Sequence, residues 1–163
     1  MRARACTPSR SSRPPRAPRV WAAASRFQRS APPDVDRVVL VAVGGGVGSV
    51  LRYLTNGLAV RWLGLDFPYG TLIVNVVGSF LIGLVQALAE EAAVLPEPAR
   101  LFLSVGVMGG FTTYSAFSFE TVRLVELDAW GRALANVIVT TVVCIGVCLL
   151  GIAAGRFVVA LRG

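Results

Sequence analysis

Four long apolar segments dominate this 163-residue chain and constrain its fold more than any other feature. A helix needs about 20 apolar residues to cross the roughly 30 Å of hydrocarbon in a bilayer. Because lipid offers no hydrogen-bond partner to an exposed backbone, segments of this length must be helical. We therefore expect an all-α integral membrane protein with four transmembrane helices. The predicted spans are 38–65, 71–89, 100–125 and 133–161.

The scarcity of charge supports a bilayer environment. Charged residues make up 15% of the chain, against about 25% in soluble domains, and the mean hydropathy is +0.67. All 16 basic residues are arginines, and the sequence has no histidine, which excludes Ser–His and Cys–His catalytic pairs. Cys144 and Cys148 lie four residues apart in an apolar segment and lack the spacing of a zinc site. We predict that the chain is not an enzyme.

Residues 1–37 differ in composition from the rest of the chain. They contain nine arginines against Asp34 and Asp36, whereas residues 38–163 carry equal numbers of basic and acidic side chains. A segment this rich in Arg, Pro and Ser cannot bury enough apolar surface to fold, so we predict a disordered tail (1–37) followed by a membrane domain (38–163). Alternative interpretations of the tail are a targeting presequence, a segment that docks on anionic headgroups, and a translation start near Val38. Because the excess positive charge lies in the tail, we expect no nucleic-acid binding by the membrane domain.

The arginines near the ends of the predicted spans bear on the orientation of the chain. Their distribution favours a cytoplasmic N-terminus, because positively charged loops are retained on that side. Without the tail, the two sides carry nearly equal numbers. That balance suits a protein that inserts in both orientations.

The third apolar segment contains a sequence that is unfavourable inside a helix. Gly109 and Gly110 are followed, after Phe111, by the β-branched Thr112 and Thr113. Both residue types weaken a helix interior, so we predict a break in the middle of the membrane. Irregular backbone survives at that depth only where it lines a cavity, meets another subunit or binds an ion.

Three further spans carry polar side chains that need a partner. Arg52 in the first span either extends to the membrane interface or supplies positive potential in a water-filled vestibule. Asn75 in the second span either bonds to a neighbouring helix or donates to an anion. In the fourth span, Asn136, Thr140 and Cys144 recur every four residues, so we expect this stripe to face protein or a pore.

Two aromatic residues follow the predicted break. Tyr114 and Phe117 lie three residues apart and share one helix face, while Ser115 and Ser118 share a neighbouring face. Ring edges carry positive partial charge and can replace part of the water shell of an anion. Ordinary packing of the two rings is the alternative interpretation.

Three motifs on successive spans, in this order and spacing, resemble the CrcB/Fluc family of fluoride channels. The resemblance covers the chain from about residue 38 to its end. It implies an antiparallel, dual-topology dimer in the bacterial plasma membrane, formed by two identical chains or by this chain and a paired homologue. The motifs are Gly44-Gly45-Gly46-Val47-Gly48 with Arg52-Tyr53, Gly70-Thr71 with Asn75 and Gly78-Ser79-Phe80, and Gly109-Gly110-Phe111-Thr112-Thr113-Tyr114-Ser115-Ala116-Phe117-Ser118.

The resemblance also implies roles for individual residues. A structural sodium ion is expected on the backbone carbonyls of Gly109 and Thr112, and Arg52 is the expected vestibule residue. The chain departs from the family pattern at Tyr114, where phenylalanine is usual and where the hydroxyl adds a competing donor, and at Ala116, where threonine is usual. The residues implied for the fluoride pathway are Asn75, Tyr114, Ser115, Phe117, Ser118, Asn136 and Thr140.

The function implied by the resemblance is passive efflux of fluoride, which lowers the cytoplasmic concentration of the anion. One alternative is a small multidrug-type proton-coupled exporter, which needs a carboxylate within the membrane. The first span has Arg52 and no acid, and Glu120 is the only acid within an apolar segment. A non-transporting membrane assembly subunit is the other alternative.

Overall fold

The computed structural model describes residues 34–91 and 95–161, so most of the predicted tail lies outside the described residues. Every regular element in the described part is helical. Four helices are long and apolar enough to cross a membrane, which confirms the predicted number of spans. These candidate spans are Val35–Leu63, Tyr69–Glu90, Glu97–Glu126 and Trp130–Ala160.

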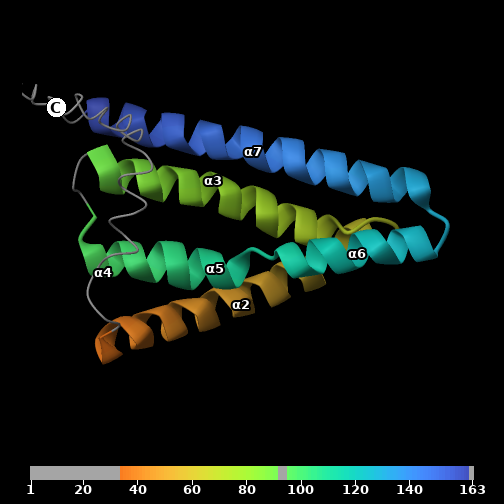
Figure 1. The fold of residues 1–163 in the computed structure, drawn as a ribbon, viewed down its shortest axis with the longest axis horizontal. Helices are drawn as coiled ribbons and strands as arrows, with labels where there is room; N and C mark the ends of the chain where they lie inside the picture. Colours follow the sequence, from red (N-terminus) through yellow and green to blue (C-terminus); the bar gives the residue numbers. More distant parts are fainter. Residues whose placement is uncertain (1–33, 92–94, 162–163) are drawn as a thin grey trace, which may run out of the picture. The chain divides into compact units, whose positions relative to one another are not determined.

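Three of the spans are continuous helices, and the third is divided (Figure 1). The continuous helices are α2 (Val35–Leu63), α3 (Tyr69–Glu91) and α7 (Trp130–Ala160). The third span consists of α4 (Glu97–Arg100), the π-helix η1 (Leu101–Val107), α5 (Met108–Phe111) and α6 (Tyr114–Glu126).

The first helix begins at Val35, earlier than the predicted 38. Asp34 has an extended backbone, and its carbonyl accepts from the Val38 amide at 3.1 Å, which closes the first turn. Arg37 forms an ion pair with Glu97 at 3.1 Å. At the other end, Gly64 has a φ of +83° and stops α2, with its amide bonded to Val60 O. Residues 35–37 therefore belong to the helix and not to the tail.

The third span lies between α2 and α3, and α7 packs along α3 (Figure 1). α2 contacts η1 and α5 through its glycines. A Cβ at Gly44 would lie 2.8 Å from Phe102 O, and a Cβ at Gly48 would overlap Val107 O. Gly151 packs on Phe80 O in the same way, where α7 meets α3. Backbone therefore meets backbone closely at both of these helix contacts.

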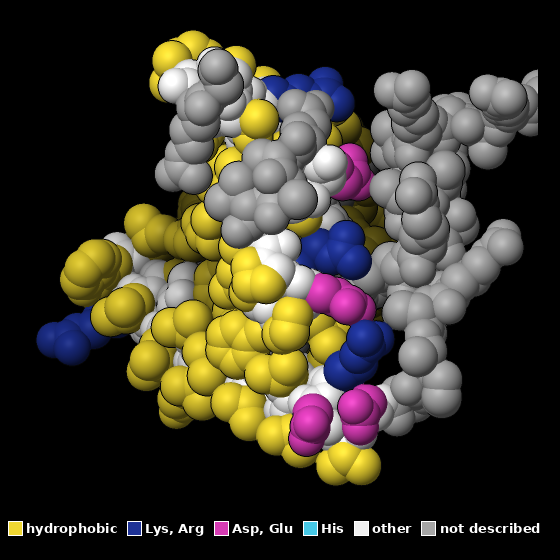
Figure 2. Space-filling view, turned by 90° about the vertical axis from the view of Figure 1, so that its left-hand side faces the viewer, with side chains coloured by type: hydrophobic (Ala, Val, Ile, Leu, Met, Phe, Trp, Pro, Cys, Tyr) yellow, Lys and Arg dark blue, Asp and Glu magenta, His cyan; other side chains and the backbone are white. Residues whose placement is uncertain are grey.

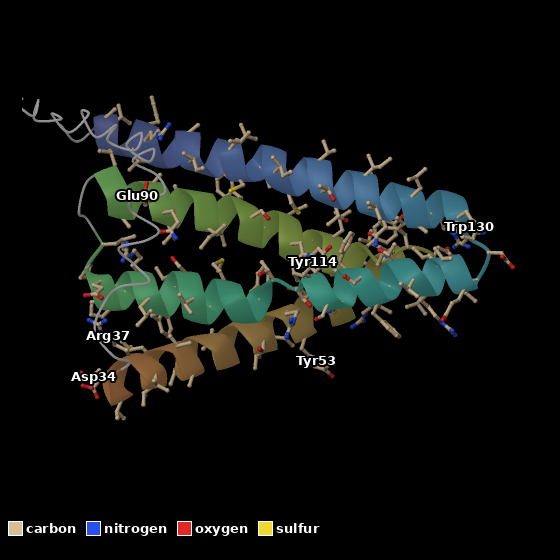
Figure 3. All side chains as sticks on the ribbon, viewed as in Figure 1. Asp34, Arg37, Tyr53, Glu90, Tyr114 and Trp130 are labelled. Carbon is tan, nitrogen blue, oxygen red and sulfur yellow. The ribbon has the colours of Figure 1, made fainter. Side chains whose placement is uncertain are left out.

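The outer surface of the helices suits lipid. Large apolar side chains such as Val50, Val142 and Leu149 are exposed along the helices. Figure 2 looks onto the end where α2 begins and α7 ends, and shows arginine and acidic side chains there beside a largely hydrophobic surface. Asp34, Arg37 and Glu90 lie at this end, and Trp130 lies at the opposite end (Figure 3).

The break in the third span falls on the threonines rather than on the glycines. Thr112 (ψ 156°) and Thr113 (φ −152°) are extended, whereas Gly109 and Gly110 remain within α5. Extended backbone suits β-branched residues. Thr113 begins the next helix, because its Oγ1 accepts from the Ala116 amide at 3.2 Å. The predicted break exists, three residues further along the chain than the first glycine.

The π-helix η1 was not expected from the sequence. It occupies the seven residues before α5, and the Met108 amide that ends it donates to Leu103 O, five residues back. Such wide turns often occur at functional sites. The third span therefore bends before it breaks.

We expect Gly48→Ala to destabilise the protein by about 1–3 kcal/mol, because the added methyl group meets backbone atoms that cannot move aside. Thermal melting of the purified protein in detergent measures the effect. Gly46→Ala is the matched control, since a Cβ at Gly46 meets nothing within 4 Å. Equal melting temperatures for the two variants would show that the contact between α2 and the third span is not tight.

Candidate functional site

The break is held by the side chain of Asn75 on α3. Its Nδ2 donates to Thr113 O at 3.0 Å, and its Oδ1 accepts from the Thr113 amide at 2.8 Å. The carboxamide thus satisfies both backbone polar groups of one residue in the break. Of the two interpretations of Asn75, bonding to a neighbouring span is confirmed. The Nδ2 group carries a second proton, which remains for another acceptor.

Arg52 on α2 also reaches the break. Its Nη1 lies 3.5 Å from Thr112 O, at the outer limit of a hydrogen bond, and the residue is half-buried. The guanidinium therefore places positive charge beside the irregular backbone. A carbonyl oxygen has two lone pairs, so Thr112 O can accept from Arg52 and still face a second partner.

The carbonyl of Gly109 is released by the same arrangement. In a continuous helix it would accept from the amide of Thr113, but that amide donates to Asn75. Gly109 is exposed, and a Cβ built on it meets nothing within 4 Å. No contact in the described chain therefore explains a glycine here.

The two rings after the break lie in contact. The centroids of Tyr114 and Phe117 are 5.5 Å apart with an interplanar angle of 45°, which confirms that they share a face. Phe117 is 8% exposed, whereas Tyr114 is 80% exposed and lies beside the break (Figure 3). A large, mostly exposed ring at the middle of a span needs lipid, another subunit or a pore next to it.

A cavity of about 480 Å³ opens beside the break, between α3, the third span and α7. It brings together many of the residues that the sequence singled out, namely Asn75, Gly109, Thr112, Tyr114, Phe117 and Thr140. The rest of its lining is Gly78, Ser79, Ile82, Ser104, Met108, Thr113, Thr141, Cys144 and Ile145.

Four other predicted residues do not line this cavity. Arg52 contacts the break at Thr112 O, as described above. Ser115 Oγ lies 3.1 Å from Thr113 Oγ1, and Ser118 Oγ donates to Tyr114 O at 2.9 Å. Asn136 is 1% exposed and bonds within the protein, which matches the first of the two predictions for its stripe, that it faces protein rather than a pore.

The sequence analysis did not select three hydroxyls of the cavity wall, those of Ser79, Ser104 and Thr141. The Ser104 hydroxyl is buried and has no hydrogen-bond partner among the described residues. In the sequence, Ser104 is a single polar residue inside an apolar run. That pattern is also common where a hydroxyl bonds to its own helix, so it does not identify a cavity residue. Ser104 therefore adds an unused donor to the wall.

A second cavity, of about 310 Å³, lies between the end of α2, the start of α3 and α6. Glu120 lines it and accepts from Thr71 Oγ1 at 2.8 Å. The other carboxylate oxygen of Glu120 and Oδ1 of Asn56 are buried without partners in the described chain. The one acid in an apolar segment is therefore separate from the first cavity.

Among the described residues, the first cavity is lined by amide, hydroxyl and aromatic groups together with apolar side chains such as Ile82, Met108 and Ile145, and no charged side chain borders it. Such a wall offers N–H and O–H donors and positive ring edges to an anion. It offers no carboxylate to a cation or to a transported proton. The chemistry of the site therefore favours an anion over the cationic drug of the exporter hypothesis.

Comparisons with known proteins agree with this chemistry. Residues 39–152 match the family model described as "CrcB-like protein, Camphor Resistance (CrcB)". A relative from Sorangium cellulosum is 44% identical over 126 residues, which are 77% of this chain and 99% of the relative. Relatives from Anaeromyxobacter sp. strain K (49% over 109 residues, 67% of this chain and 86% of the relative) and Magnetococcus marinus (38% over 122 residues, 75% and 99%) are also similar. All three carry the name fluoride-specific ion channel FluC.

Proposed function

Because this chain belongs to the CrcB family, whose curated relatives are fluoride-specific ion channels, we propose that it lowers cytoplasmic fluoride by passive efflux of the anion. It is a multi-pass membrane protein with four spans. The observation that supports the proposal most directly is the uncharged cavity beside the break, whose wall includes amide, hydroxyl and aromatic groups. Fluoride holds its water strongly, so a pathway has to replace that water with N–H, O–H and ring-edge contacts.

We assign the ion pathway first to the residues that line the cavity. Asn75 has one amide proton left after bonding Thr113, and Phe117 presents its ring at the same wall. Tyr114 adds a hydroxyl group there, and Thr140 borders the cavity with its hydroxyl proton donated to Asn136 Oδ1. Ser115, Ser118 and Asn136 lie outside the lining, so we propose that Ser115 and Ser118 border the part of the pathway that a second subunit completes.

A second subunit explains the exposed groups at the break. Tyr114 is 80% exposed, and Gly109 is exposed with open space around its Cα. An antiparallel copy, or a paired homologue, packed on this surface would cover both. The chain alone would present half of a site, since Gly109 and Tyr114 line the cavity and are themselves exposed. We therefore propose a dual-topology dimer.

The same surface fits a structural sodium ion. The Gly109 carbonyl has lost its amide partner to Asn75, and Thr112 O has a lone pair beyond its contact with Arg52. Carbonyl oxygens are suitable ligands for a hard cation. Two carbonyls are too few for sodium, so we propose that Gly109 and Thr112 of both subunits hold the ion together.

The driving force needs no coupled reaction. Fluoride enters a cell as the neutral weak acid, ionises in the cytoplasm and is trapped there. A membrane potential that is negative inside contributes about 2.3 kcal/mol per charge per 100 mV toward anion exit. The cavity lining holds no carboxylate among the described residues, in agreement with electrodiffusion.

Flux from liposomes tests the function. Purified protein in liposomes loaded with potassium fluoride should release fluoride when an ionophore lets potassium leave, and should pass little chloride. The absence of fluoride release from well-folded protein would overturn the proposal. Proton uptake that depends on a cationic drug would favour the exporter instead.

We expect Phe117→Ile to slow fluoride by up to about tenfold, since a ring contact contributes about 0.5–1.5 kcal/mol beyond its burial. The variant should remain assembled on size-exclusion chromatography. Phe119→Ile is the matched control on the same helix, because Phe119 is 71% exposed and does not line the cavity. Wild-type flux in Phe117→Ile would remove this ring from the pathway.

We expect Gly109→Val to prevent dimer assembly while leaving the subunit folded, because a Cβ at this position meets nothing within 4 Å in its own chain. Light scattering after size-exclusion chromatography measures the oligomer, and circular dichroism measures the helix content. Gly146→Val is the control, since Gly146 is also exposed in a span and open at its Cβ. A Gly109→Val dimer with normal flux would contradict the proposed interface and sodium site.

A further inference from the structure

Three hydrogen bonds in series connect α7 to α6. Thr140 Oγ1 donates to Asn136 Oδ1 at 3.2 Å, and Asn136 Nδ2 donates to Thr121 Oγ1 at 2.8 Å. Thr121 Oγ1 in turn donates to Phe117 O at 2.7 Å. We call these four residues the relay. Its two ends, Phe117 and Thr140, line the first cavity, whereas Thr121 and Asn136 do not.

The donors and acceptors of the relay determine one another. A hydroxyl has a single proton, so Thr121, which donates to Phe117 O, can only accept from Asn136. Thr140 Oγ1 donates its one proton to Asn136 Oδ1. Asn136 and Thr121 therefore each accept one bond of the relay and donate the next. Because Asn136 is 1% exposed, water does not compete for its bonds.

The position of α6 depends on such bonds more strongly than it would if α5 and α6 formed one continuous helix. The extended residues Thr112 and Thr113 separate α6 from α5, so the backbone does not fix its rotation. Among the helices packed on α6, α7 makes the largest contact. The relay crosses this contact, and one of its bonds ends on the carbonyl of the residue whose ring lines the cavity.

We propose that Thr121 and Asn136 are positioning residues of the ion pathway, which hold the Phe117 ring and the Thr140 hydroxyl in register across the cavity without touching the ion. This inference depends on the proposed channel function. It assigns a role to Thr121, a residue that the sequence analysis did not select. It also places Asn136 behind the wall of the pathway, as its burial requires.

The test uses Thr121→Val, which keeps the side-chain shape and removes both bonds of the hydroxyl. A hydrogen bond between membrane helices typically corresponds to about a threefold change in an equilibrium. We expect fluoride flux per correctly assembled protein to fall by about threefold or more, and Thr121→Ser to restore it. Should Thr121→Val fail to assemble, Thr121→Ala gives the same comparison with a smaller side chain.

Thr55→Val is the matched control. Thr55 Oγ1 donates to Leu51 O at 2.8 Å, which is the same bond to the carbonyl four residues back, but it has no interhelical partner among the described residues. Its flux should equal that of the wild type. Wild-type flux in assembled Thr121→Val, or an equal loss in Thr55→Val, would overturn the inference.

A melting experiment separates this inference from the channel function. Thr121→Val, Asn136→Leu and the double variant form a cycle, and the relay requires that their effects on the melting temperature are not additive. If the wild type passes no fluoride, the proposed function fails, while non-additive melting still supports the relay. Additive melting would overturn it whatever the flux.

Discussion

The paired hydrogen bonds between the Asn75 carboxamide and the backbone of Thr113 are the interaction on which the rest of the structure depends. A break inside hydrocarbon leaves backbone groups that no water can reach, and each costs several kcal/mol when unsatisfied. Asn75 supplies one donor and one acceptor at 3.0 and 2.8 Å, so a single side chain makes the extended residue tolerable. The same bonds leave the Gly109 carbonyl without its helical amide partner. The support of the break and the release of this carbonyl therefore have one cause.

Once the break is tolerated, the two halves of the third span have different tasks. The glycines of α2 pack closely on η1 and α5, which fixes the first half against the scaffold. The second half, α6, contacts mainly α7, and its polar side chains bond to α3 and α7 through Glu120 and Thr121. The cavity lies where these two halves meet α3 and α7. Because the two halves of the third span are held by different helices, both can direct rings and hydroxyls at the cavity, whereas a continuous helix would direct some of them elsewhere.

The sequence predicted the spans and the shared face of Tyr114 and Phe117, because each follows from hydropathy or helical periodicity. It predicted a break within the stretch from Gly109 to Thr113 without saying which residues are extended, since low helix propensity marks a weak segment but does not say which peptide units leave the helix. The bond between Asn75 and Thr113 required knowledge of two neighbouring spans. Thr121 was not predicted, because the sequence does not distinguish a threonine that bonds only its own helix from one that also bonds another helix. The separate cavity around Glu120 depends on three helix ends that periodicity does not bring together.

The π-helix before α5 has a consequence for how this chain can vary. A wide turn holds one residue more than the α-helical turn that it replaces, and removal of one residue from Leu101–Val107 would restore an ordinary helix without opening the chain. Such a deletion would leave the residues after η1 facing nearly their present neighbours, because the extra residue is contained within the wide turn. The same deletion in an α-helical part of the span would rotate everything that follows by about 100°, the angle that one residue occupies in an α-helix. The direction in which the break faces is therefore sensitive to chain length in the α-helical parts of the span and tolerant of the loss of one residue in η1.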